Sequence, residues 1–76
     1  MNVEQLRAAL RNIPHANFSY TPHVVQGSGP GDMPYITDEN NRWIVGWTER
    51  GVWTPLHEFN TEDEACRWLY DDLTSR

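Results

Sequence analysis

Apolar residues recur every three or four positions at the start of the chain, which is the period of one helical face. The stripe consists of Val3, Leu6, Leu10 and Ile13. Asn2 precedes it and Gln5 follows three residues later, as in a helix capping box. Pro14 ends the pattern, because a residue that precedes proline is disfavoured in helical geometry. The sequence therefore predicts a helix that begins after Asn2 and ends before Pro14.

Residues 15–34 carry weaker signals. Phe18 and Tyr20 alternate with polar residues, and Val24 and Val25 suffice only for a short strand. Prolines and glycines then interrupt any regular pattern. We interpret residues 26–34 as an exposed, glycine-rich loop.

Three strands are predicted after this loop, and the two turns between them are rich in residues that favour turns. The strands are expected at residues 35–37, 42–48 and 52–59, with turns at 38–41 and 49–51. In the second strand, Trp43, Val45 and Trp47 alternate onto one face. Pro55 cannot donate a hydrogen bond to a neighbouring strand, so the third strand is predicted to lie at an edge or to be bulged.

The last hairpin allows two registers. A two-residue turn pairs Glu49 with Val52 and directs Trp53 away from the predicted core. A three-residue turn with a bulge at Gly51 directs Trp53 toward the core instead. We favour the longer turn, because it also buries Phe59, which leads directly into the next helix.

The final helix has the clearest start in the sequence, with Thr61 as the capping residue and Glu64 at the third helical position. Its apolar face consists of Ala65, Cys66, Trp68, Leu69 and Leu73. These elements predict one α+β domain over residues 1–76: an N-terminal helix, a three-stranded antiparallel β-meander and a C-terminal helix.

Charge narrows the choice of partner. The chain has 76 residues and a net charge of −5, from eleven acidic residues against six arginines. Such a surface repels phosphate backbones, so we expect no nucleic-acid binding, and it favours a basic protein partner. A single cysteine excludes an internal disulfide, and no apolar run approaches the ~20 residues of a membrane span. We expect a cytoplasmic protein that does not enter a membrane.

Candidate catalytic chemistry is sparse. His15, His23, His57 and Cys66 are the soft metal ligands, and their spacing matches no zinc pattern. A Cys66–His57 nucleophilic pair is disfavoured, because three acidic residues precede the cysteine and oppose thiolate formation. The glycine-rich loop lacks the lysine and the following helix of a phosphate-binding loop. We expect no catalytic residues, no bound metal and no cofactor.

Two segments resemble a known family. Residues 43–51 (WIVGWTERG) and 59–66 (FNTEDEAC) resemble small bacterial immunity proteins encoded beside polymorphic toxins. These proteins carry a W-x-V-x-aromatic-x-E-R-G hairpin and an F-x-S/T-E-D-E-A-C helix start. The resemblance covers residues 33–73, and Gly46 stands where a second aromatic residue is expected. It implies an inhibitor that binds a cognate toxin and covers its active site, and both NAD-degrading and nuclease toxins fit.

The candidate partner contacts lie on the sheet face that two helices leave uncovered. They are Ile44, Leu56 and, in the shorter-turn register, Trp53, with an acidic rim of Asp38, Glu39 and Glu58. Apolar side chains inside an acidic rim suit a toxin domain with a basic active-site cleft. Two alternatives stay open: a small acidic adaptor or regulatory module, including a DNA mimic, and contact through loop 26–34 instead of the sheet.

Overall fold

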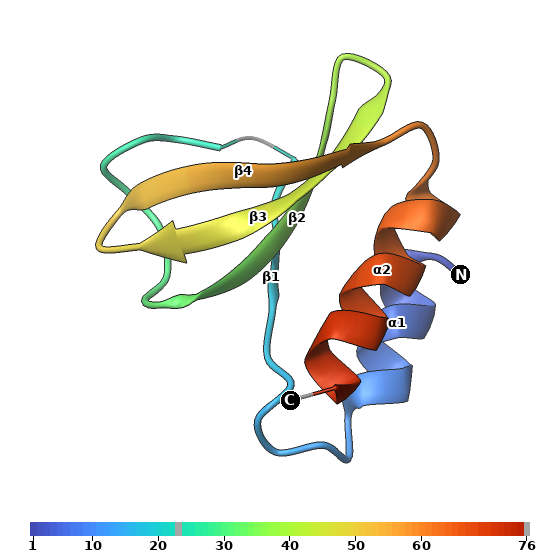
Figure 1. Ribbon diagram of the computed structural model, residues 1–76. Coiled ribbons are helices and arrows are strands. Elements are labelled where there is room, and N and C mark those ends of the chain that lie inside the picture. The colour runs from blue at the N-terminus through green and yellow to red at the C-terminus, as the bar shows by residue number, and fades with distance from the viewer. Residues whose placement is uncertain (23, 76) are drawn as a thin grey trace.

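The computed structural model describes residues 1–22 and 24–75. Two helices pack against one side of a sheet, and the long connection between the first two strands lies against the other side (Figure 1). The elements are α1 (Val3–Leu10), β1 (Ser19–Tyr20), β2 (Met33–Glu39), β3 (Arg42–Glu49), β4 (Val52–Phe59) and α2 (Glu62–Thr74). The predicted α+β class is confirmed, whereas the described residues form a sheet of four strands and not three.

The predicted capping box starts α1. The Asn2 side chain accepts a hydrogen bond from the Gln5 backbone at 2.8 Å, and the Gln5 side chain accepts one from the Asn2 backbone at 2.9 Å. The helix ends at Leu10, earlier than predicted, and the following turn still brings Ile13 against the core. The apolar period thus identified the residues that pack against the core. Ile13, whose backbone is restricted because it precedes Pro14, lies outside the helix.

The two helices begin side by side. Thr61 caps α2 as predicted, because its hydroxyl accepts a hydrogen bond from the Glu64 backbone at 3.2 Å. The Glu62 side chain accepts a hydrogen bond from the Val3 backbone at 2.8 Å, which joins the starts of α1 and α2. Two helix N-termini at one end concentrate positive dipole charge, and this carboxylate offsets it.

The sheet has the order β1-β2-β3-β4, with β1 parallel to β2 and the other pairs antiparallel. Strand β1 was not predicted, since its two residues pair with a strand more than ten residues later in the chain. The β2–β3 hairpin turns at Asn40 and Asn41, whose φ angles are 53° and 64°. Positive φ at both central residues is the type I′ geometry that matches strand twist.

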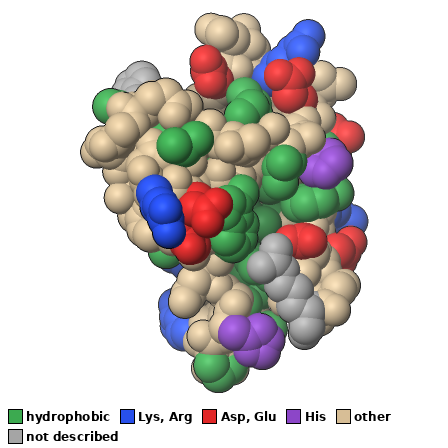
Figure 2. Space-filling view, turned by 60° about the vertical axis from the view of Figure 1, so that its left-hand side comes forward, with side chains coloured by type: hydrophobic (Ala, Val, Ile, Leu, Met, Phe, Trp, Pro, Cys, Tyr) green, Lys and Arg blue, Asp and Glu red, His purple; other side chains and the backbone are tan. Residues whose placement is uncertain are grey.

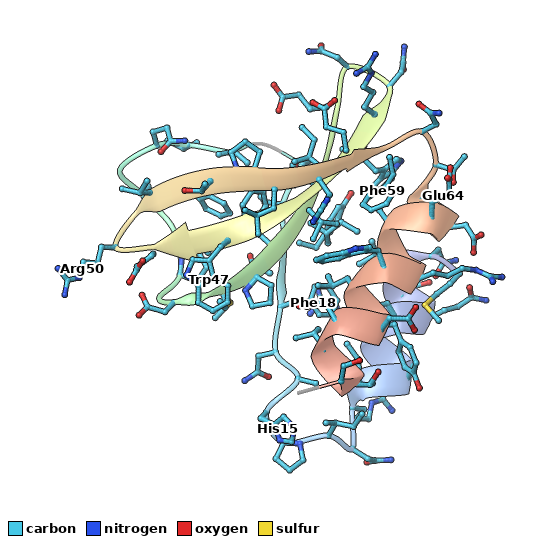
Figure 3. The ribbon with its side chains drawn as sticks, viewed as in Figure 1. His15, Phe18, Trp47, Arg50, Phe59 and Glu64 are labelled. Atoms are coloured by element: carbon cyan, nitrogen blue, oxygen red, sulfur yellow. The ribbon has the colours of Figure 1, made fainter. Side chains whose placement is uncertain are left out.

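The favoured register of the last hairpin is wrong. Glu49 pairs with Val52 across a two-residue turn, so Trp53 lies on the outer face of the sheet, away from the helices. Farther along β4, the pairing shifts by one residue, and Leu56 is the extra residue of this bulge. The bulge returns Phe59 to the inner face, beside α2 (Figure 3). Phe59 is partly buried as expected, but the bulge at Leu56 places it there and not a longer turn.

The part of the outer face around Trp53 is covered by Val25 and by the start of the predicted loop 26–34. The Trp53 indole N–H donates to the backbone carbonyls of Val25 at 3.0 Å and Ser28 at 2.6 Å. The Gln26 side chain accepts from the Trp53 backbone N–H at 3.2 Å and donates to its carbonyl at 3.1 Å. Trp53 is therefore only 7% exposed. The loop backbone supplies the acceptors that a buried indole requires.

Thr48 provides a test of this outer layer. Its side chain is fully buried, and among the described residues its hydroxyl has no hydrogen-bond partner. Thr48→Val keeps the shape and removes the unpaired hydroxyl, so we expect the free energy of unfolding to rise by about 1 kcal/mol in urea titrations. Thr54→Val, at an exposed site, should change it little. A clear loss of stability in Thr48→Val would show that the hydroxyl is hydrogen-bonded in solution.

Candidate functional site: a protein-binding surface

The structure brings together three of the six predicted contact residues. Glu39, Ile44 and Trp53 line one hollow of about 280 Å³ on the outer face, together with Val24 and Pro55. Glu58 pairs with Ile44 on the neighbouring strand but does not line this hollow. The hollow thus joins one predicted carboxylate, Glu39, to the predicted apolar residues Ile44 and Trp53, and its lining also contains the polar residues Gln26 and Thr37.

Trp53 is not the exposed contact residue that the shorter-turn register predicted. Its ring is packed beneath the loop and meets Tyr35 edge to face, with ring centroids 4.9 Å apart. Trp53 is therefore available to a partner only where it lines the hollow. Sequence reasoning missed this because the covering contacts come from residues more than 20 positions earlier.

Asp38 lies on the opposite face of the sheet from Glu39, because successive strand residues alternate. It pairs across the hairpin with Trp43, and its carboxylate accepts a long hydrogen bond from the Tyr20 hydroxyl at 3.4 Å. Asp38 therefore belongs to a different surface from the outer hollow.

Leu56 stands out as an exposed apolar residue. It is 56% exposed at the bulge of β4, and Val52 near the turn of the same strand is 57% exposed. A second hollow of about 370 Å³ joins Val52 to Trp47, at the end of the sheet that extends beyond the helices (Figure 3). Figure 2 shows hydrophobic side chains gathered in a band across the middle of one face, with acidic side chains on both sides. The exposed leucine and valine of β4 are therefore candidates for contact with a partner.

The outer edge of β4 is closed to strand addition. The Gln26 side chain occupies the outward backbone groups of Trp53. Pro55 has no N–H to donate, and the bulge at Leu56 breaks the regular ladder. A partner must therefore contact β4 through side chains and not by extending the sheet.

The charged groups beside this strand stay largely hydrated. Glu58 accepts a hydrogen bond from Arg42 at 2.9 Å, and both side chains are more than half exposed. Exposed pairs of this kind contribute about 0–1 kcal/mol to stability. Both groups are therefore available to a partner at little cost to the fold.

The cysteine is unsuited to nucleophilic chemistry. Cys66 is fully buried in the core, and burial, followed by the charge of Glu62, raises the pKa of its thiol to about 11. His57 is exposed, and its ring packs on Trp68 at 4.5 Å between centroids. The Cys66–His57 pair considered from the sequence therefore lacks an activated thiolate.

Metal ligands were also considered in the sequence. Within residues 1–22 and 24–75, no three side chains of His, Cys, Asp or Glu come together as a metal-binding group. His23, one of the four candidate ligands, lies outside the described residues. None of the helices in the described ranges has the length and apolar character to cross a membrane.

Sequence reasoning missed one surface entirely. Tyr20 and Trp43 stack with ring centroids 6.2 Å apart and planes 18° apart. The alternation of Phe18 and Tyr20 was the available signal, but two residues are too few to identify a strand or its neighbour.

Comparisons with known proteins give no family assignment: no family model matches the chain, and no match is found among curated proteins or solved structures. The candidate site therefore rests on the geometry above.

Proposed function

We propose that this protein is an immunity protein that neutralises a cognate bacterial toxin by binding it and covering a basic active-site cleft. On this proposal it acts without turnover in the cytoplasm of the cell that it protects. The family resemblance of residues 43–51 and 59–66 supports the proposal, as does the net charge of −5. The toxin class, NAD-degrading or nuclease, stays open.

The observation that carries the proposal is the exposed apolar surface of β4. Leu56 is more than half exposed, because the core of so small a domain has room for only part of its apolar residues. Glu58 lies two residues away, and Glu39 borders the neighbouring hollow. Desolvation of the apolar centre slows dissociation, while the carboxylates accelerate encounter with a basic surface.

The test is co-expression with the C-terminal domain of the protein encoded immediately upstream. We expect the two chains to co-purify as one complex and the host cells to survive expression of that domain. Cell death together with separate elution of the two chains would contradict the proposal. A complex without protection would instead support the adaptor alternative.

A substitution on β4 tests where the partner binds. Leu56→Arg introduces a cation into the surface that should meet a basic cleft, so we expect affinity to fall by about tenfold or more. The fold should be unaffected, because the side chain is 56% exposed. Calorimetric titration against the purified toxin domain measures the change.

Val25→Arg is the matched control. Val25 is 59% exposed and directly precedes loop 26–34, so Val25→Arg adds the same charge at the loop and away from Leu56. If Val25→Arg abolishes binding and Leu56→Arg does not, the loop and not β4 contacts the partner. This pair is a cleaner test than replacing residues 27–31, because Ser28 also holds Trp53.

A further inference from the structure

The Tyr20–Trp43 pair occupies an end of the sheet that the sequence did not identify as a site. Tyr20 comes from β1 and is 38% exposed, and Trp43 comes from β3 and is half-buried. Their rings stack across β2, which separates the two strands. The exposed face of Tyr20 is therefore an aromatic surface that is held in place from behind by a second ring.

Carboxylates lie on both sides of this pair. Asp38 accepts a hydrogen bond from the Tyr20 hydroxyl, and it shares a hollow of about 510 Å³ with Glu39 and Trp43. On the other side, Glu4 and Glu62 line a hollow of about 340 Å³ with Tyr20. Partial burial, then the charges of Asp38 and Glu62, raise the pKa of the Tyr20 phenol. Asp38 and Glu62 thus place negative charge beside the ring.

The nearby arginines form no ion pair with Asp38 among the described residues, although Arg7 places positive charge on the helix side of Tyr20. Arg7 also lines the hollow beside Tyr20, but its guanidinium lies over the Phe18 ring, 5.0 Å from the centroid. Among the described residues, the arginine ion pairs are Arg42 with Glu58 and Arg67 with Asp63. Neither pair neutralises Asp38, so the negative charge beside the aromatic rings is not balanced by those arginines.

We propose that the Tyr20–Trp43 pair and Asp38 form a docking point for an arginine side chain of the basic partner. The inference rests on the proposed function, which supplies a basic partner, and it names the group that this partner presents. A guanidinium is planar and weakly hydrated, so it stacks on an aromatic face while its N–H groups reach a carboxylate. Lysine matches only the charge, and arginine matches both features.

The proposal is testable without any toxin. The probe is N-acetyl-arginine amide, and its matched control is N-acetyl-citrulline amide, which has the same shape without the charge. Two-dimensional NMR should show shifts of the Tyr20 ring and the Trp43 indole N–H with the arginine probe. We expect the citrulline probe to bind at least about tenfold more weakly, since the attraction depends on charge.

Two variants localise the effect. Asp38→Asn and Tyr20→Leu should each abolish the shifts, whereas Asp71→Asn, at an exposed position of α2, should leave them unchanged. Asp38→Asn alters an exposed group, so it keeps the test decisive if Tyr20→Leu fails to fold. Equal responses to both probes, or shifts that persist in Asp38→Asn, would overturn the docking point.

The outcome is separable from that of the proposed function. A protein that binds the arginine probe at Tyr20 but not the toxin domain would retain the docking point and lose the immunity proposal. A protein that binds the toxin domain with no probe response at Tyr20 would lose the docking point alone.

Discussion

Gly46→Ala should destabilise the protein by roughly 1–3 kcal/mol or more, although alanine is ordinarily the better residue within a strand. A Cβ atom at this position would lie 2.2 Å from the backbone carbonyl oxygen of Thr54 and 2.7 Å from the Tyr35 ring. The carbonyl belongs to the backbone of β4 and cannot move without disturbing the bulge at Leu56. Urea denaturation followed by tryptophan fluorescence measures the loss.

Gly31→Ala is the matched control. A Cβ atom at Gly31 would meet nothing within 4 Å, so we expect a change within about 0.5 kcal/mol. If Gly46→Ala were as stable as the unaltered protein, the Tyr35 ring could not lie over Gly46, and the described register of β3 and β4 would be wrong.

Leu69→Ala should lower the free energy of unfolding by about 2–5 kcal/mol, the usual range for a buried leucine. Leu69 is fully buried on the face of α2 that packs against the sheet. Its truncation leaves a cavity between helix and sheet, and the rigid strands can close it only in part. Because small domains are only marginally stable, the loss removes a large share of the total stability. Thermal unfolding by circular dichroism measures it.

Asp71→Ala controls for the loss of a side chain on the same helix. Asp71 is exposed, so its truncation should change stability by about 0.5 kcal/mol or less. If the two variants had equal melting temperatures, the buried face of α2 would have been assigned wrongly.

Local signals in the sequence predicted the local structure well. The capping box at Asn2 and the N-cap at Thr61 are both present, although the Glu64 side chain accepts a hydrogen bond from the Thr61 hydroxyl and not from its backbone N–H. The period of apolar residues identified the buried face of each helix. Strand β4 runs from Val52 to Phe59 as predicted. These features depend on neighbours within four positions or on a simple period, so the sequence contains enough information to find them.

Contacts between distant residues were not predictable in the same way. Strand β1 exists only because Ser19 and Tyr20 pair with β2, and no pattern in two residues reveals that pairing. The burial of Trp53 depends on carbonyls of Val25 and Ser28. Residues 26–32 form a loop that is mostly exposed, as the glycine-rich composition predicted, but no local pattern showed that the backbone carbonyls of Val25 and Ser28 accept hydrogen bonds from an indole.

The candidate site shows the same difference between local signals and contacts of distant residues. Ile44, Leu56 and Glu58 were identified from strand alternation, and the structure leaves Leu56 and Glu58 exposed and Ile44 lining a hollow. Asp38 lies on the opposite face of the sheet from Glu39 and joins Tyr20 instead. The contact between Asp38 and Tyr20 depends on β1, which no local pattern predicts, so the sequence did not reveal it.

The most direct test of the central claim is an activity titration of the purified C-terminal domain of the protein encoded immediately upstream, which we propose to be the toxin. On our account, toxin activity falls in proportion to the added protein and vanishes at an equimolar ratio, because each molecule covers one active site. Leu56→Arg should shift this titration to higher concentration, and Val25→Arg should not. Undiminished toxin activity in the presence of excess unaltered protein would contradict the account.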